Sequence, residues 1–249
     1  MKVAPLVLLL VVSGCARPEN ALRSGSQSQA SADVHVRLMV KVGGKVGFAD
    51  ETGKLVINPQ WDSAFPFNEG LAMVCVGECD YEHIAGYRLT KNFQRITLEQ
   101  TYKYGFLDES GKLAINPSFE EARNFSEGMA AVCLGIGCYY TLDRKDKSRK
   151  WGYIDKAGSI IIPAQFDEAY DFKEGLASVS VGGKWGYIDK TGKFLINPQF
   201  DDAGPFEKGF AQVGLKVPGK EESSNPYDGS KIKFGYIDKT GKYIWEPSN

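Results

Sequence analysis

Residues 151–184 read WGYIDKAGSIIIPAQFDEAYDFKEGLASVSVGGK, and residues 185–213 begin the same text again as WGYIDKTGKFLINPQFDDAGPFEKGFAQV. The spacing of the two WG pairs makes the unit 34 residues long. Self-similarity at such a period is typical of repeat proteins, whose units bury apolar surface by packing on their neighbours. The chain is therefore expected to be an array of small like units.

The same pattern occurs five times along the chain. Each copy has a glycine, then an aromatic residue, an aliphatic residue or Ala, and Asp; the glycines are Gly47, Gly105, Gly152, Gly186 and Gly235. A second glycine follows three residues after each Asp, and a short apolar run ending in Pro comes next. An aromatic–acid pair follows in four copies: Trp61-Asp62, Phe119-Glu120, Phe166-Asp167 and Phe200-Asp201.

The stretch KWGYIDKTGK at 184–193 is similar to the signature of WG-repeat proteins, also called KWG repeats. The resemblance extends from Val36 to Pro247. The first copy departs from it with Val46 before the glycine, and the second and fifth have Tyr104 and Phe234 where the family has Trp. The resemblance implies repeat modules of mostly undefined role, and it transfers no catalytic residue.

Three strands are expected in each unit. Residues 176–181 alternate in the manner of a half-buried strand, and Gly182-Gly183 suits a tight hairpin turn to a second strand, KWGYID. The DKTG turn leads to a third strand, which is expected to stop at Pro198. Five three-stranded antiparallel meanders follow, so the fold class is all-β. The meanders must stack, and we expect a closed or nearly closed propeller-like ring, with an open solenoid-like arc as the alternative.

Aromatic residues recur at fixed offsets and are expected to form the core between sheets. They are Trp151, Trp185, Tyr153, Tyr187, Phe166, Phe172, Phe200 and Phe206. The functional alternative is that they form platforms for sugar rings or peptides. Five repeated aspartates, one in each DKTG-type turn, are expected to cap those turns rather than act as acids or bases.

The N-terminus has the features of an export signal. Residues 1–14, MKVAPLVLLLVVSG, have a short basic start and an apolar run too short to span a bilayer, so they predict a signal peptide. Residues 12–15 resemble a bacterial lipobox, which implies lipidation of Cys15, anchoring in the cell envelope and, since Asp does not follow, an outer-membrane address. The alternative is an ordinary signal peptide. Residues 15–33 are expected to be a lipidated cysteine and flexible tether, and residues 34–249 the repeat domain.

The units differ in length at one place, the hairpin between the first and second strands. Insertions are predicted at about 77–103, 135–149 and 214–232, which would project from one rim. Tyrosines beside basic residues suit contacts with a protein or a glycan. The candidate binding rim comprises Tyr81, Tyr87, Arg88, Tyr139, Tyr140, Arg144, Lys145 and Tyr227. The alternative is tolerated surface extension.

Four cysteines beside Cys15 lie at the start of two insertions: Cys75, Cys79, Cys133 and Cys138. An even number in an exported chain predicts disulfides. Proximity favours Cys75–Cys79 and Cys133–Cys138, while a Cys75–Cys133 bond and a four-thiol metal site remain alternatives.

The sequence shows no catalytic constellation. There is no GxSxG, no HExxH and no phosphate-binding glycine loop before a helix, and the formal net charge of −1 gives no pull toward nucleic acid. No cofactor and no metal site are expected. The residues predict a non-catalytic envelope scaffold that binds a protein or glycan, with an unrecognised hydrolase or a purely structural surface module as alternatives.

Overall fold

The computed structural model describes residues 37–77, 79, 87–89, 95–97, 102–134, 149–217 and 232–247. The described residues all lie within the compact unit His35–Asn249, and the fold below is that of this unit. Its described residues form strands and turns and no helix, which confirms the all-β class.

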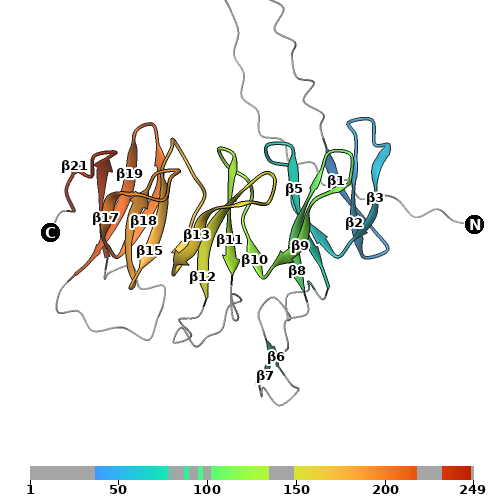
Figure 1. Cartoon of the computed structure of the whole chain (residues 1–249), viewed down its shortest axis with the longest axis horizontal. Helices are drawn as coiled ribbons and strands as arrows, with labels where there is room; N and C mark the ends of the chain where they lie inside the picture. Colours follow the sequence, from blue (N-terminus) through green and yellow to red (C-terminus); the bar gives the residue numbers. More distant parts are fainter. Residues whose placement is uncertain are drawn as a thin grey trace, which may run out of the picture. The chain divides into compact units, whose positions relative to one another are not determined.

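Five antiparallel sheets follow one another along the chain, and a separate hairpin lies within the first insertion (Figure 1). Sheet 1 contains β1 (Leu38–Val42), β2 (Lys45–Ala49) and β3 (Leu55–Trp61). Sheet 2 contains β4 (Ser63–Ala64), β5 (Leu71–Val76), β8 (Lys103–Asp108) and β9 (Leu113–Phe119). Sheet 3 contains β10 (Glu121–Ala122), β11 (Met129–Leu134), β12 (Lys150–Asp155) and β13 (Ile160–Phe166). Sheet 4 contains β14 (Glu168–Ala169), β15 (Ala177–Val181), β16 (Lys184–Ile188) and β17 (Phe194–Phe200). Sheet 5 contains β18 (Asp202–Glu207), β19 (Phe210–Lys216), β20 (Ile232–Asp238) and β21 (Tyr243–Trp245), and the separate hairpin is β6 (Tyr87–Leu89) with β7 (Arg95–Thr97).

The two predicted turns of each unit are confirmed in sheet 4. Gly182 and Gly183 join β15 to β16 with φ of 62° and 78°, a left-handed pair that glycine adopts without steric penalty. At the other end of β16, the Asp189 carboxylate accepts hydrogen bonds from the N–H groups of Thr191 (2.9 Å) and Lys193 (3.1 Å). The same capping recurs at Asp50, Asp108, Asp155 and Asp238.

The third strand does not stop at its proline, and that expectation was wrong. β17 continues through Pro198 to Phe200, and the register shifts between the pairs Trp185↔Phe200 and Tyr187↔Ile196. The shift is a β-bulge opposite Gly186, where a residue without an N–H can sit because the ladder is interrupted. The bulge presses so close that a Cβ on Gly186 would lie 2.5 Å from the carbonyl oxygen of Ile196. The WG glycine is thus required by a close backbone approach.

A fourth strand, not predicted from the sequence, joins each sheet after the first. The loop expected to return the chain to the next unit contains β4, β10, β14 or the longer β18, each paired with the first long strand of the following sheet. These strands have no alternating apolar pattern because most are only two residues long, too short for a period of two to show. Each of these strands also contacts the preceding sheet, so it helps to join two consecutive sheets.

The sheets form an open row, with sheet 1 at one end and sheet 5 at the other (Figure 1). Of the two geometries considered, the ring that we favoured is wrong and the open solenoid-like arrangement is observed. Each hydrophobic cluster lies between two consecutive sheets, so every inner sheet is covered on both faces. Seven of the eight predicted core aromatics are buried, and Trp185 is partly buried.

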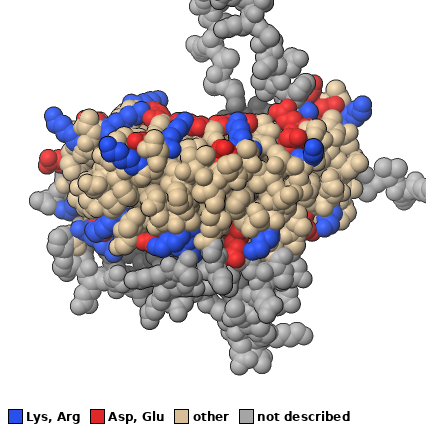
Figure 2. All heavy atoms as spheres, viewed as in Figure 1, with Lys and Arg blue, Asp and Glu red and all other residues tan. Residues whose placement is uncertain are grey.

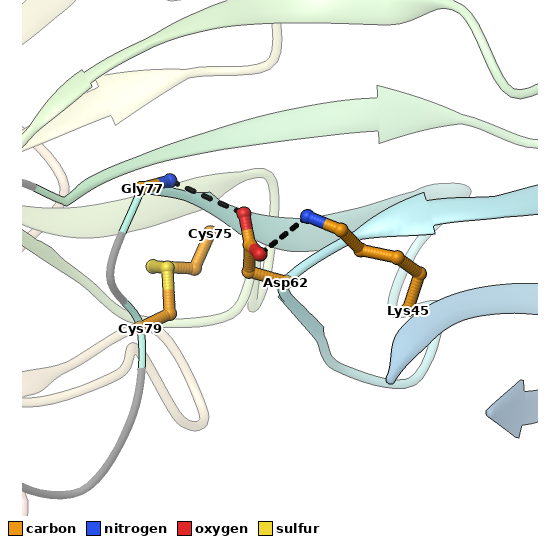
Figure 3. The surroundings of a disulfide bond; sticks show 5 residues. All are labelled: Lys45, Asp62, Cys75, Gly77 and Cys79. Atoms are coloured by element: carbon orange, nitrogen blue, oxygen red, sulfur yellow. Dashed lines mark hydrogen bonds and ion pairs between the residues drawn. A yellow bond between two sulfur atoms is a disulfide. The ribbon is translucent and has the colours of Figure 1, made fainter. Parts of the chain in front are cut away.

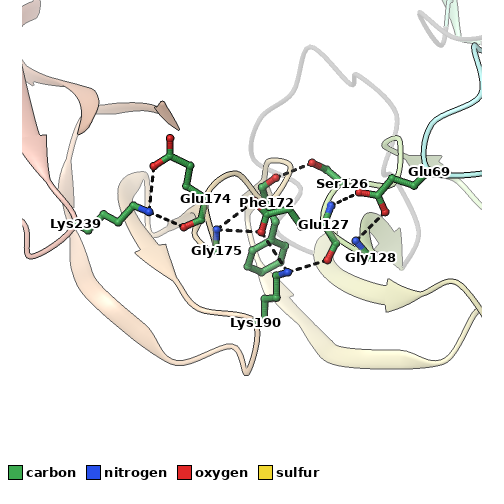
Figure 4. A network of polar contacts seen from close by, with 9 residues as sticks. All are labelled: Glu69, Ser126, Glu127, Gly128, Phe172, Glu174, Gly175, Lys190 and Lys239. Carbon is green, nitrogen blue, oxygen red and sulfur yellow. Dashed lines mark hydrogen bonds and ion pairs between the residues drawn. The ribbon is translucent and has the colours of Figure 1, made fainter. Parts of the chain in front are cut away.

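One edge of the row is held by a repeated contact, which we call the ladder edge (Figure 4). Glu69, Glu127 and Glu174 each precede the first long strand of a sheet and have φ near 52°. The Glu127 carboxylate accepts a hydrogen bond from the N–H of Gly175 in the next unit (3.0 Å) and lies 3.2 Å from Lys190 Nζ of that unit. Glu69 makes the same two contacts with Gly128 and Lys156 of its following unit. Glu174 makes them with Gly209 and Lys239.

These contacts hold the three glutamates in a left-handed backbone conformation, which is strained for a residue other than glycine. A left-handed non-glycine residue costs roughly 1 kcal/mol or more and persists where surrounding contacts fix it. Burial of the Glu69 carboxyl acts to raise its pKa, but the hydrogen bonds from Gly128 and Lys156 outweigh burial, so the pKa is lowered. The carboxylate is therefore held in its charged form between consecutive units.

Candidate binding edge

The edge opposite the ladder edge carries all three insertions, and we call it the insertion edge. The first insertion occupies 77–102, between β5 and β8, and the second occupies 135–149, between β11 and β12. The third is shorter than predicted, at 217–231, because β19 extends to Lys216. The first two insertions replace the two-residue turn of an uninserted hairpin, since Val76↔Lys103 and Leu134↔Lys150 occupy the same register position as Val181↔Lys184. In sheet 5 the pair at this position is Leu215↔Lys233, and the strands pair one residue further, to Lys216↔Ile232.

In sheets 2, 4 and 5 a carboxylate at this edge joins the root of the hairpin to the preceding sheet. Asp62 accepts hydrogen bonds from Lys45 Nζ of sheet 1 (2.5 Å) and from the N–H of Gly77 of sheet 2 (3.3 Å), as Figure 3 shows. Asp167 bridges Lys150 Nζ and the N–H of Gly182, and Asp201 bridges Lys184 Nζ and the N–H of Lys216. The predicted aromatic–acid pairs therefore place their acids between consecutive units, rather than simply on the surface.

The electrostatics of this bridge can be followed at Asp167. Burial acts to raise the pKa of its carboxyl, but the hydrogen bonds from Lys150 and from the N–H of Gly182 outweigh burial and lower it. The pKa of Asp201 is lowered for the same balance of reasons, with Lys184 and the N–H of Lys216 as donors. In sheets 2, 4 and 5 the bridge therefore holds the root of the hairpin, both where the hairpin carries an insertion and where it does not.

A disulfide lies at the root of the first insertion. Cys75, the fifth residue of β5, is bonded to Cys79, and the Asp62 bridge lies beside the bond (Figure 3). Cys133, at the same place in β11, is also disulfide-bonded, and its predicted partner Cys138 lies outside the described residues. Both cysteines are buried where unit 4 has Ser180.

A cluster of charged side chains surrounds the root of the second insertion. Arg149, its last residue, forms an ion pair with Glu168 at the start of β14. Glu121, at the start of β10, occupies the same repeat position one unit earlier. Burial raises the pKa of Glu121 to about 7, Arg149 acts to lower it, and Glu168 acts to raise it. This carboxyl can therefore change its charge near neutral pH.

Replacing Glu121 with Gln is expected to stabilise the protein in a pH-dependent way. The carboxyl has its full stabilising effect below its unfolded pKa of 4.5, and this stability is lost as the pH rises through about 7. The stability of Glu121→Gln relative to the native chain should therefore increase between about pH 5 and pH 8, by at most about 3 kcal/mol.

Urea unfolding at both pH values measures this difference. Asp167→Asn is the control with the opposite sign. The pKa of Asp167 is lowered in the folded protein, so its carboxylate stabilises the fold at every pH above the unfolded pKa. Asp167→Asn should therefore be less stable than the native chain at both pH values. An equal effect of Glu121→Gln at both pH values would contradict the prediction.

A strip of stacked side chains crosses from sheet 3 to sheet 4. The Arg123 guanidinium lies 5.4 Å from the ring centroid of Trp151 and 4.3 Å from that of Tyr170. The Tyr170 and Trp185 ring centroids are 5.2 Å apart, and Tyr170 is exposed. Figure 2 shows charged side chains gathered along the upper and lower margins of the viewed face, with a largely uncharged band between them. Cation–π stacking of this kind joins sheets and leaves one ring available for contact.

This strip could not be predicted from the repeated residues. Arg123 and Tyr170 share a repeat position that is held by Phe65 and Gly204 in two other units. A position whose residue type changes from unit to unit carries no signal in a search for repeated residues. Glu121 was missed for a related reason, since its pKa depends on burial and on charges from other units.

The predicted rim falls largely outside the part of the chain that the structure describes. This applies to Tyr81, Tyr139, Tyr140, Arg144, Lys145 and Tyr227. Tyr87 and Arg88 lie in β6, which pairs with β7 in the first insertion. The strands that flank the three insertions are described, and the insertions leave the same edge of sheets 2, 3 and 5. Cys15 and the tether also lie outside the described residues.

Metal-ligating side chains do not gather in the described residues. These residues contain no group of three or more His, Cys, Asp or Glu side chains able to hold a metal ion. A hollow of about 470 Å³ beside sheet 5 is lined by Lys216, Lys233 and Glu246 among others, and Glu121 is not part of its lining. Within the same described part, no helix has the length and apolar character to cross a membrane.

Comparison with known families gives one result. A family model described as a WG containing repeat matches residues 47–78, 104–135, 151–185 and 185–215. Each match begins in the second long strand of one sheet and includes the first long strand of the next, and the first two end at the insertions. No curated protein shows significant similarity to the chain.

Proposed function

Because these four matches cover just over half of the chain, the protein belongs to the WG-containing repeat family, and we propose that it is a non-catalytic scaffold that binds a protein or a glycan at its insertion edge. The observation that carries this proposal is the location of the three insertions. All of them leave the row at one edge, while the ladder edge has short turns throughout the described sheets.

The physical support lies in how the hairpin roots are held. Asp62 and Asp201 bind the hairpin backbone directly where the first and third insertions begin. A rigid support under segments of variable length is the arrangement in which surface loops usually carry recognition. The charged cluster of Glu121, Arg149 and Glu168 lies at the root of the second insertion and adds polar groups to the same edge.

The uninserted hairpins supply the design of the test. Residues 77–102, 135–149 and 216–232 are each replaced, one insertion at a time, by the Gly-Gly pair that joins β15 to β16. The third range is one residue wider at each end than the insertion, so that Leu215 and Lys233 take the places of Val181 and Lys184. Cys75→Ser or Cys133→Ser accompanies the first two variants, because Ser180 holds that place in unit 4. Far-UV circular dichroism and thermal unfolding check that each variant remains folded.

Binding is then measured with solubilised envelope proteins and with sedimented peptidoglycan sacculi. We expect at least one shortened variant to lose about tenfold or more of the capture of a specific protein or of the sacculi. If all three folded variants retain the full binding profile, the scaffold does not bind through this edge and the proposal fails.

We further propose that the scaffold is held in the cell envelope by lipid on Cys15, with the outer membrane as its address. The support is the lipobox-like stretch before Cys15 together with the apolar run of residues 7–12. Palmitate labelling of the native chain and of Cys15→Ala tests this anchor. Label on the variant, or unchanged membrane association, would contradict it.

A further inference from the structure

Two contacts recur at all four internal junctions of the row, and a third recurs at the three junctions between sheets 2 and 5. The aromatic ring in the second long strand of one sheet packs edge-on against a Phe of the next, as for Tyr187 and Phe206 at 4.8 Å. An Ile of the third strand lies against the turn glycine of the next unit, as Ile196 does at Gly241. The Glu–Lys contact of the ladder edge completes the junction.

We call the face of a sheet that contacts the following sheet its forward face. Sheet 5 has the residues of a forward face, but no sheet follows it among the described residues. Trp245 holds the place of Ile196 and is 53% exposed, and Phe210 holds the place of buried Leu176 and is 40% exposed. Tyr236 holds the place of Tyr187. Where the Tyr187 hydroxyl donates to the backbone of the next unit, the Tyr236 hydroxyl accepts from Gln212 of its own sheet (3.2 Å).

Sheet 1 presents the opposite set at the other end. Gly53 has no heavy atom within 4 Å of a built Cβ, whereas the turn glycines of the four later units each lie within that distance of an Ile of the sheet before. Leu38 is 45% exposed, although the equivalent Ala177 is buried. Gly53 and Leu38 are therefore exposed on the face of sheet 1 that would contact a preceding sheet. Trp245 and Phe210 are exposed on the face of sheet 5 that would contact a following one.

The charges of the ladder contact are exchanged at these two ends. The three junctions between sheets 2 and 5 pair a Glu before the first long strand with a Lys in the turn of the next unit, whereas the turn of the second unit has Glu109 in the place of the Lys. The last unit has Lys208 in the place of that Glu, with the same left-handed backbone (φ 55°). The first unit has Glu51 in the place of the Lys, and both side chains are exposed. A second copy placed after sheet 5 would therefore restore an ion pair with its polarity reversed.

We propose that copies of this chain associate head to tail, with the forward face of sheet 5 of one copy against sheet 1 of the next. The two ends are different surfaces, so the contact is heterologous and produces open chains of growing length rather than a closed dimer. Sheet 1 has three described strands where later sheets have four, so this junction buries less surface than an internal one. The association is accordingly weaker than the internal stacking and depends on protein concentration.

The test uses residues 15–249 with Cys15→Ala, so that no acyl chain contributes to association. Analytical ultracentrifugation from about 1 μM to about 1 mM should show an average mass that rises continuously with concentration. Lys208→Glu and Glu51→Lys each place like charges at the junction and should weaken association about fivefold. The double variant recreates the internal Glu–Lys pair, and its association constant should return to within about twofold of the starting chain.

A matched pair of apolar variants tests the sheet face. Trp245→Ser should weaken association by at least about tenfold, because it removes the largest exposed ring of the face. Ile244→Ser is the control: Ile244 is 61% exposed, and the equivalent Leu195 remains 51% exposed at an internal junction, so this change should leave association unaltered.

Three outcomes would overturn the proposal. The first is a monomer at every concentration, and the second is a double charge variant that is no better than the singles. The third is association that appears only after residues 15–34 are removed, which would identify the N-terminal segment as the occupant of the end face. Circular dichroism of every variant shows whether the sheets remain intact.

Discussion

Gly186→Ala is expected to destabilise the protein by at least about 3 kcal/mol. Its new Cβ would lie 2.5 Å from the Ile196 carbonyl oxygen, 2.7 Å from the Pro198 nitrogen and 2.8 Å from the Asn197 carbonyl carbon. All three are backbone atoms of the β17 bulge, so no side chain can rotate away to relieve the contact. In an ordinary strand position the same change would stabilise by roughly 0.5–1 kcal/mol, so the sign of the effect reports the close approach.

Gly204→Ala is the matched control for this change. A Cβ at Gly204 meets its nearest heavy atom, the Gln212 carbonyl oxygen, at 3.5 Å, which is ordinary contact. The variant should be no less stable than the native chain, and up to about 1 kcal/mol more stable. Urea unfolding followed by circular dichroism measures both variants. Equal midpoints for the two alanines would show that the bulge can shift, and would remove the reason given for the WG glycine.

Phe172→Ala is expected to cost about 3–5 kcal/mol, the usual range for a large core aromatic. Phe172 is fully buried between sheets 3 and 4, and its ring centroid is 4.9 Å from that of Tyr153. The loss removes apolar burial and leaves a cavity at a junction that both sheets need, so the unfolding midpoint should fall sharply.

Phe210→Ala tests the same chemistry where no further unit covers the ring. Phe210 lies on the exposed forward face of sheet 5, so its removal in dilute solution should cost no more than about 1 kcal/mol. Differential scanning calorimetry at low protein concentration compares the two variants. A comparable fall in melting temperature for both would mean that stacking between units is not the main source of stability.

The repeat and its turns could be predicted because they depend on residues close in sequence. Gly182-Gly183 closes a hairpin locally, and Asp189 caps a turn by bonding N–H groups two and four residues ahead. The recurrence of Phe172 and Phe206 at one offset indicated packing between like neighbours, and both are buried. These features need no knowledge of how the sheets are placed.

The remaining features depend on contacts across units. The bulge at Pro198 is set by the approach of Gly186, and the left-handed turn of Glu127 is fixed by Gly175 and Lys190 of the following unit. Ring closure was mispredicted because five units satisfy either geometry by number alone. The exchange of charge at Lys208 becomes meaningful only when the ladder contact is known. The described roots of the insertions identify the candidate edge, while its ligand depends on the segments between them.

The ladder contact has a consequence for how such arrays evolve. The carboxylate of Glu127 and the ammonium of Lys190 belong to consecutive units, and the same offset recurs from Glu69 to Lys156 and from Glu174 to Lys239. A gene segment duplicated by unequal crossing-over would therefore bring one acid and one base into register at each new boundary. Arrays of this kind can gain or lose inner members in a single recombination event, provided that the two terminal members are retained.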